Sequence, residues 1–232
     1  MDIENGAALQ GAVSNLEAFQ HPKEFTTFSK QKNVLAGDLT NIDSDDLEII
    51  ESFKKGNEQA FNTLVNKYQK KVYWIVRKMV LDHDEANDIT QDIFIKIYSS
   101  LHDFRGDSKF FTYIYKISVN FCLNHISKKK RTTNKQVDIE DETLEIKSDE
   151  MATDEHFDEK RKQKLLKEAI ESLEGQQRVV FNMRFYDNLS YEEIAAQMNK
   201  SVGGMKANYF HAVKKIETYI KSKKDIKEIF TC

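Results

Sequence analysis

Polar side chains suited to DNA recur along a helix predicted from Val202 to about Ile220. The residues expected to face outward on this helix are Lys206, Asn208, His211, Lys214 and Lys215. Lysine neutralises phosphate charge, which supplies most of the sequence-independent affinity for DNA. The predicted DNA-binding set also includes the start of the helix, Ser201 to Gly204. Because Gly203 and Gly204 have no side chain, backbone N–H groups there can approach a phosphate.

This helix is the second of a pair with the dimensions of a helix-turn-helix. Ser190 and Glu193 have the spacing of a capping box, in which each side chain accepts the backbone N–H of the other residue. They open a short helix, and a tight turn at 199–201 leads to the longer helix, as in this motif. The residues expected to point inward from the longer helix are Met205, Tyr209, Val213 and Ile216. A basic helix face taken alone often serves only solubility, so the capped pair of helices carries the DNA-binding prediction.

A second set of polar residues lies on a helix predicted within 84–101. Its apolar stripe, with steps of three and four residues, is Ala86, Ile89, Ile93, Ile97 and Leu101. The opposite face is expected to form an interface made of Asp88, Gln91, Asp92, Phe94, Ile95 and Lys96. Exposed Phe94 and Ile95 within a polar rim are typical of a protein interface. The alternative for the acidic residues is an ordinary solvated helix face.

A break at 104–108 separates that helix from the next one. Gly106 tolerates a turn backbone, and Ser108 is expected to cap the following helix. The second stripe, expected to be buried, is Phe111, Ile114, Tyr115, Ser118, Phe121 and Cys122. Because this helix ends in the basic run Lys128–Arg131, it combines an aromatic core face with a basic tail.

Two further helices are predicted before these. Asp45 and Asp46 are expected to cap a short helix that ends at Gly56, and Asn57 is expected to cap a long one. The apolar repeat of the long helix is Phe61, Leu64, Val65, Tyr68, Val72, Ile75, Val76 and Met79. A repeat this regular predicts packing against neighbouring helices.

The composition favours helices and argues against several classes of protein. The 232 residues are 40% hydrophobic and 31% charged, with one proline. No apolar run approaches the roughly 20 residues of a membrane helix, and no leader is recognisable, so a cytoplasmic protein is expected. Two cysteines and six scattered histidines give no disulfide framework, metal cluster or nucleophile–base pair. We therefore expect no enzyme, no cofactor and no metal.

Charge is segregated along the chain. Residues 132–160 carry eleven acidic and three basic residues, whereas residues 161–232 carry fourteen basic and nine acidic ones. Residues 46–130 are also weakly basic, so the net charge of −3 hides two basic blocks. The segment 132–159 has few large apolar residues and cannot offset its ordering entropy, which predicts a flexible acidic linker.

The string from Asp84 to Arg131 resembles the second conserved domain of bacterial sigma factors of the extracytoplasmic-function (ECF) group of the sigma-70 family. The stretch 189–216 resembles their fourth domain, which reads the minus-thirty-five element. In that family the segment like 84–101 docks on the clamp coiled coil of RNA polymerase. The following loop holds an extruded promoter base, and the next helix reads the minus-ten element.

The resemblance implies roles for individual residues. The loop expected to line the base pocket is Phe104, Arg105, Gly106, Asp107 and Ser108. Lys116 and Asn120 are expected at the minus-ten bases, and Asn124 and Lys128 at the nearby backbone. Many relatives have an arginine-rich pattern on the minus-thirty-five helix, where this chain has lysine, asparagine and histidine. The resemblance therefore does not give the promoter sequence, because lysine and asparagine lack the guanine fork of arginine.

The expected fold is all-α, with two helical domains joined by a flexible acidic linker. Residues 45–131 would form a sigma region 2 helical domain, 132–159 the linker and 160–222 a region 4 helix-turn-helix domain. Residues 1–44 are expected to be a disordered extension, and 223–232 a C-terminal tail.

The expected function is to bind core RNA polymerase, direct it to promoter DNA and nucleate promoter opening, with no small-molecule substrate. An anti-sigma partner, often membrane-anchored in relatives, is also implied. Two other classes stay open from the residues alone: a helix-turn-helix regulator with a helical sensory or dimerisation domain, and a helical adaptor with no DNA affinity.

Overall fold

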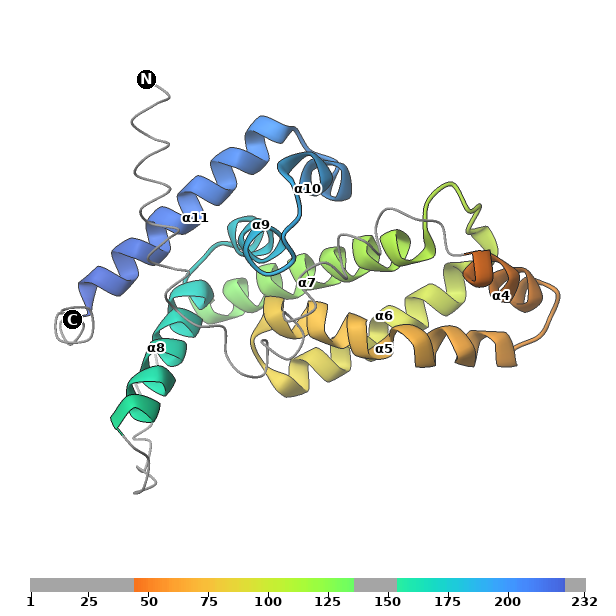
Figure 1. Ribbon diagram of the computed structural model, residues 1–232, viewed down its shortest axis with the longest axis horizontal. Coiled ribbons are helices and arrows are strands. Elements are labelled where there is room, and N and C mark those ends of the chain that lie inside the picture. The colour runs from red at the N-terminus through yellow and green to blue at the C-terminus, as the bar shows by residue number, and fades with distance from the viewer. Residues whose placement is uncertain (1–43, 136–153, 224–232) are drawn as a thin grey trace.

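The computed structural model describes residues 44–135 and 154–223, and every element in these two segments is a helix (Figure 1). In chain order the elements are α4 (Ser44–Lys54), α5 (Gln59–Val80), α6 (His83–Ser100), the short 3-10 helix η1 (Leu101–Asp103), α7 (Phe110–Lys135), α8 (Asp154–Glu171), α9 (Gly175–Phe185), α10 (Tyr191–Met198) and α11 (Val202–Ser222). The all-α prediction is confirmed. The predicted extension, 1–44, lies outside the described residues except for Ser44, and the predicted C-terminal tail lies outside them except for Lys223.

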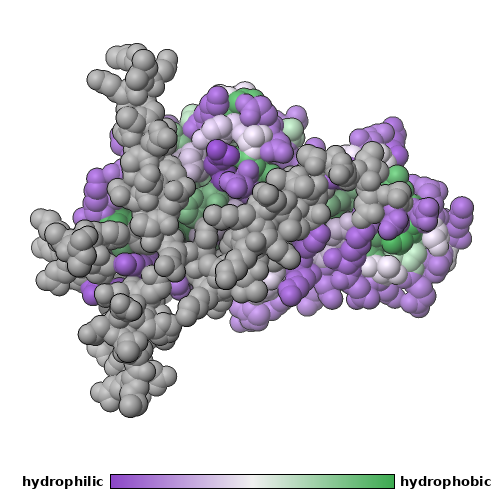
Figure 2. All heavy atoms as spheres, viewed as in Figure 1, coloured by the Kyte–Doolittle hydropathy of each residue, from purple (hydrophilic) through white to green (hydrophobic). Residues whose placement is uncertain are grey.

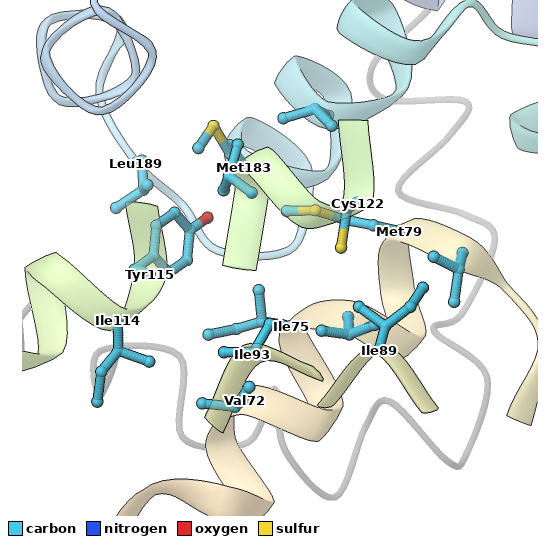
Figure 3. Close-up of a cluster of buried hydrophobic side chains, with 14 of the residues drawn as sticks. Val72, Ile75, Met79, Ile89, Ile93, Ile114, Tyr115, Cys122, Met183 and Leu189 are labelled. Carbon is cyan, nitrogen blue, oxygen red and sulfur yellow. The ribbon is translucent and has the colours of Figure 1, made fainter. Parts of the chain in front are cut away.

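Helices α5, α6 and α7 pack along one another and form the N-terminal half of the molecule. The predicted stripes meet in the centre of this bundle, where Val72, Ile75, Ile93 and Ile114 are fully or almost fully buried (Figure 3). Burial of branched aliphatic side chains contributes roughly 1.5–3 kcal/mol each, which makes this core the main stabilising feature of the bundle. Figure 2 shows that the visible outer surface along α5 and α6 is mostly hydrophilic.

Two of the predicted helix caps are wrong. Asp46 lies inside the first turn of α4, where its carboxylate accepts hydrogen bonds from Lys67, at 2.7 Å, and from the Tyr68 hydroxyl. Asn57 does not cap α5, because its side-chain amide donates to Ser52 instead. Both polar groups therefore hold α4 in place. Gly56 follows α4 with a positive φ of 96°, as the predicted helix end requires.

The expected acidic linker is shorter than its predicted bounds. Helix α7 continues to Lys135, and α8 begins at Asp154, so both ends of the segment 132–159 are helical. The part between them, 136–153, lies outside the described residues. Continuation of α7 past Arg131 is consistent with the absence of proline or glycine in that stretch.

The C-terminal half is built from α8 to α11, with α11 packed across α8, α9 and α10. The turn between α10 and α11 is the predicted one, since Asn199 adopts a left-handed backbone with φ 51°. Phe181 of α9 stacks on Tyr209 of α11 with ring centroids 6.1 Å apart. Tyr191 of α10 packs on the same Tyr209 ring, with centroids 6.0 Å apart, so Tyr209 holds α11 against both α9 and α10.

The two halves are packed against each other. Helix α9 contacts both α5 and α7, and α10 also contacts α7. Tyr115 and Cys122 of α7 share one buried apolar cluster with Met183 and Leu189 of the C-terminal half (Figure 3). Burial raises the pKa of the Cys122 thiol, which therefore stays protonated in this cluster. Within the two described segments, none of the helices combines the length and apolar character needed to cross a membrane.

Candidate nucleic-acid interface

The outer face of α6 is the first candidate surface. Helix α6 begins after Asp82, whose side chain accepts the backbone N–H of Glu85 at 2.9 Å. Its predicted inner stripe is buried as expected. The outward residues of the prediction that are exposed are Asp88, Gln91, Asp92, Ile95 and Lys96. Ile95 is 68% exposed, which is a high value for a large apolar side chain.

Phe94 is not part of this surface, and its prediction as an exposed anchor is wrong. It is only 9% exposed and belongs to the core. Helix α6 contacts both α5 and α7, so its buried arc is wider than a single stripe and includes the residue beside Ile93. Two packing neighbours on different sides cannot be deduced from the periodicity of one helix.

Tyr98 belongs to the outer face of α6 and was not predicted from the sequence. It lies three residues after Ile95 and is also exposed, at 42%. Its ring packs edge-on against Phe53 and Phe61, with centroids 5.3 and 5.0 Å away. The steps from Asp88 through Gln91 and Ile95 to Tyr98 alternate between three and four residues, and this spacing is the signal that would have identified it.

The loop after η1 is the second candidate surface, and three of its five predicted residues are exposed. Arg105, Asp107 and Ser108 are exposed, and Gly106 between them has a positive φ of 78°. That backbone conformation favours glycine and creates the sharp turn. Lys54 of α4 donates to the backbone carbonyl of Phe104 at 2.7 Å and so ties the start of the loop to the bundle.

Two predictions for this loop are corrected. The Phe104 side chain is 7% exposed and packs on Phe110 and Tyr113, with ring centroids 5.6 and 5.1 Å away, so it supports the loop from below. Ser108 does not cap α7: its hydroxyl donates to the Lys109 carbonyl at 3.3 Å, and that carbonyl accepts the first helical N–H, from Tyr113.

Helix α7 continues from this loop with a polar stripe on its solvent side. The four predicted residues at steps of four, all exposed, are Lys116, Asn120, Asn124 and Lys128. The opposite side of the helix is anchored in the core through Ile114 and Tyr115. Together the loop and the stripe expose two lysines, two amides and one arginine, which offer donors to phosphates and both donors and acceptors to bases.

The helix-turn-helix is the third candidate surface. The capping box is present: the Ser190 backbone N–H donates to Glu193 at 2.7 Å, and the Glu193 N–H donates to the Ser190 hydroxyl at 3.1 Å. Ser201 caps α11 by accepting the N–H of Gly204 at 3.2 Å. The predicted inner residues of α11, Met205, Tyr209, Val213 and Ile216, are all buried.

The outer face of α11 differs from its prediction in detail. Lys206, His211, Lys214 and Lys215 are exposed, whereas Asn208 is half-buried and donates to the Gly204 carbonyl at 2.9 Å. The N–H of Gly204 is also engaged, by the Ser201 cap, so an incoming phosphate would meet Gly203 and the residues before it. Lys215 pairs with Glu174 at 3.1 Å, and this pair is exposed and weak.

The three candidate surfaces lie on an all-helical fold of two halves. The family profile of Sigma-70 region 2 matches residues 64–132, which include the α6 face, the loop and the α7 stripe. The profile of Sigma-70, region 4 matches residues 163–216, which include the helix-turn-helix.

Relatives of known function match over most of their length. The chain is 37% identical to the ECF RNA polymerase sigma-E factor of Escherichia coli (strain K12) over 181 residues, 75% of this chain and 94% of that protein. It is 32% identical to the RNA polymerase sigma-H factor of Pseudomonas aeruginosa over 178 residues, 74% of this chain and 92% of that protein. The chain belongs to the ECF group of the sigma-70 family, and it is a sigma factor that directs RNA polymerase to promoters.

Solved structures share the fold. CnrH in complex with the cytosolic domain of CnrY has a TM-score of 0.50 and 19% identity, and the match covers 78% of this chain and 99% of that one. The sigma factor RpoE in complex with the anti-sigma factor NepR from Bartonella quintana also has a TM-score of 0.50 and 19% identity. That match covers 71% of this chain and 98% of the other chain. The predicted family and function are confirmed, whereas the roles of individual residues stay predictions.

Proposed function

We propose that the three surfaces divide the work of promoter recognition among them. The outer face of α6, centred on Ile95 and Asp92, docks on core RNA polymerase. The loop at 105–108 and the stripe on α7 act on the minus-ten element, and α11 reads the minus-thirty-five element. The observation that carries this assignment is the exposure of Ile95 among polar residues on a helix whose other side is fully buried.

Capture of a single-stranded base by the loop drives promoter opening in this proposal. Extrusion of a base costs a few kcal/mol, and hydrogen bonds to its edge and stacking can offset that cost. Arg105, Asp107 and Ser108 are the exposed polar groups of the loop, and Gly106 lets the backbone approach the base. Phe104 contributes by holding the loop rigid from the core side.

Affinity for the duplex comes mainly from lysines on α7 and α11 through phosphate contacts. Asn120 reads a minus-ten base, because its amide both donates and accepts and lies exposed between Lys116 and Asn124. On α11, Lys206 and His211 face the bases, while the half-buried Asn208 orients the first turn through its bond to Gly204.

The polymerase supplies the chemistry of RNA synthesis, and this chain acts as a transcription initiation factor. Its place of action is the cytoplasm, where core polymerase and promoter DNA are found. The two structural relatives with TM-scores of 0.50 were solved with protein partners, one of which is named an anti-sigma factor. Those complexes support an anti-sigma partner for this chain as well.

Reconstitution tests the proposal. Purified chain is mixed with core RNA polymerase and a promoter library, and initiation sites are mapped with and without the chain. We expect a defined subset of promoters to fire only when the chain is present. Duplex binding without any effect on polymerase would instead identify a conventional helix-turn-helix regulator. Failure to bind either polymerase or DNA would identify a helical adaptor and overturn the assignment.

A further inference from the structure

A cavity lies where parts of four helices meet, and its lining includes no residue of the three candidate surfaces. Its volume is about 460 Å³, within the roughly 300–1,000 Å³ that is typical of small-molecule sites. The lining comes from the last turn of α5, the C-terminal part of α7, the end of α8 with the turn that follows it, and the first turn of α9 (Figure 1). A molecule bound in this cavity would therefore contact four helices at once.

The buried part of the lining is largely apolar. Val80 of α5, Ile126 of α7 and Leu173, in the turn after α8, all line the cavity and are buried. Their side chains offer van der Waals contact and no hydrogen bonds. Small-molecule sites are mostly built in this way, with a few polar groups that fix the orientation of the ligand.

Arg178 of α9 supplies the buried polar group of the lining. The residue is 9% exposed, and its guanidinium donates to the carbonyl of Met79 at 3.5 Å and to the carbonyl of Glu171. Its Nε–H is also buried, and it has no hydrogen-bond acceptor within the part of the chain that the structure describes. Because a buried donor without an acceptor is costly, this group favours a ligand that brings an oxygen atom into the cavity.

Two lysines of α7 add positive charge at the opening. Lys129 and Lys130 both line the cavity and are exposed. Lys129 donates to Glu85 at 2.7 Å, so its charge is matched by a carboxylate, and His125 lies 3.0 Å from the other oxygen of that carboxylate. Lys130 makes no such close pair, which leaves its charge for a ligand.

The charges around the cavity favour a ligand with one negative charge. The cations are Arg178, Lys129 and Lys130, and the carboxylates are Glu85 and Glu171, of which Glu171 lines the cavity directly. Three positive charges and two negative ones leave one positive charge over. A carboxylate carries one negative charge, whereas a phosphate monoester carries nearly two at pH 7 and would be less well matched.

We propose that this cavity binds a small organic carboxylate. The apolar body of the ligand packs against Val80, Ile126 and Leu173, and its carboxylate accepts hydrogen bonds from the Arg178 Nε–H and the Lys130 ammonium group. Hydrogen bonds between charged partners are stronger than neutral ones, and a partly enclosed apolar site strengthens them further. The site is separate from polymerase docking and DNA reading, so it does not depend on the roles proposed for those surfaces.

Binding of 2-naphthoate to the full chain tests the proposal. This probe joins a fused apolar ring to one carboxylate, whereas acetate keeps only the anion and 2-naphthalenemethanol keeps only the apolar body. We expect naphthoate to bind with a Kd of about 1 mM or tighter, as its size allows. Acetate and the alcohol should bind at least tenfold more weakly by isothermal titration calorimetry. Equal affinity of naphthoate and the alcohol would overturn the carboxylate site, and no binding of naphthoate would overturn the proposal as a whole.

Two variants with opposite expected effects locate the site. Lys130→Gln removes a cation from the opening and should weaken naphthoate binding at least threefold, whereas Glu171→Gln removes a carboxylate and should strengthen binding about threefold. Both residues are exposed, so the variants should keep the helix content and the Tm of the unmodified chain.

Matched control variants distinguish the cavity from general charge effects. Arg131→Gln removes a cation from the same basic run of α7, and Glu48→Gln removes a carboxylate from α4, both at exposed positions outside the cavity lining. Neither should change the Kd for naphthoate by more than about 1.5-fold, because exposed charges at a distance are screened by salt. If the control variants shift the Kd as much as Lys130→Gln and Glu171→Gln do, the probe binds non-specifically and the proposed site is wrong.

Discussion

Glu85 on α6 and Lys129 on α7 form an ion pair with 2.7 Å between nitrogen and oxygen, and His125 lies 3.0 Å from the other oxygen of the same carboxylate. The start of α6 is therefore fixed to the C-terminal part of α7. Burial pushes the pKa of Glu85 upward, but the hydrogen bonds and charges of Lys129 and His125 outweigh it and hold this pKa below its ordinary value.

This pairing predicts a pH-dependent effect of Glu85→Gln. A carboxyl with a lowered pKa in the folded state stabilises the protein at pH above its ordinary value, about 4.3. The stabilisation is lost as the pH falls through the lower folded pKa. At pH 7 the variant should lose less than about 1 kcal/mol in its free energy of unfolding, because Lys129 is largely exposed. Urea unfolding at pH 7 and at about pH 3 measures the difference, which should vanish in acid. A difference that grows on acidification would contradict this prediction.

Asp92→Lys should weaken binding of the chain to core polymerase while the helical fold is kept. Asp92 is exposed on the outer face of α6, and reversal of its charge disturbs the polar rim around Ile95 without touching the core. Co-purification with core polymerase measures the effect. Glu48→Lys makes the same charge change at an exposed site on α4 and should bind normally. Equal binding of the two variants to polymerase would show that the outer face of α6 is not part of the interface.

Ile95→Ser should lower affinity for polymerase about tenfold, or about 1.4 kcal/mol, because it removes the apolar anchor of the docking face. The free energy of unfolding should stay within about 0.5 kcal/mol of the unmodified chain, since the side chain is exposed. Tyr98→Ser differs, because Tyr98 also packs on Phe53 and Phe61, and it should lower stability as well as affinity. Titration of labelled polymerase and thermal unfolding separate the two effects.

Local patterns were sufficient for the features whose partners lie nearby in the sequence. The capping box joins Ser190 and Glu193, three residues apart, and the buried stripes follow the helical period, so both were predicted from the chain alone. Partners distant in the sequence were not predicted. Asp46 was expected to cap α4 because nothing local indicates Lys67 and Tyr68 as its partners.

The packing of the two halves was not predicted for the same reason, because its contacts join residues that are distant in the sequence. The partners of Asp187 are Tyr115 and Lys78, which precede it by 72 and 109 residues, and a turn aspartate carries no signal for either contact. Phe94 was misplaced because its burial depends on a second neighbouring helix. The helices within each half were therefore largely predictable, while the packing of the two halves against each other required the structure.

Asn120→Ala should relax specificity at one position of the minus-ten element by about 1–3 kcal/mol, because a bidentate amide contact to a base is lost. Affinity for polymerase should not change, since Asn120 lies on α7, away from the outer face of α6. Lys128→Ala provides the contrast within the same stripe. Loss of a phosphate contact should weaken binding to all promoters about equally. It should also reduce the salt dependence of that binding by about one charge. Transcription from a panel of promoters with mutated minus-ten elements measures the specificity. If Asn120→Ala and the unmodified chain rank these promoters identically, Asn120 does not read a base.

Ser190→Ala should destabilise the helix-turn-helix by about 1 kcal/mol, because it leaves the backbone N–H of Glu193 without its acceptor at the start of α10. Glu193 still accepts the N–H of residue 190, so the helix frays without being lost. Affinity for a minus-thirty-five duplex should fall modestly, since α10 supports the angle of α11. Ser190→Asp keeps a capping oxygen and should restore most of the stability. Ser222→Ala removes an exposed hydroxyl at the far end of α11 and should have no effect on either measurement. Equal free energies of unfolding for Ser190→Ala and Ser190→Asp would show that the cap does not stabilise this motif.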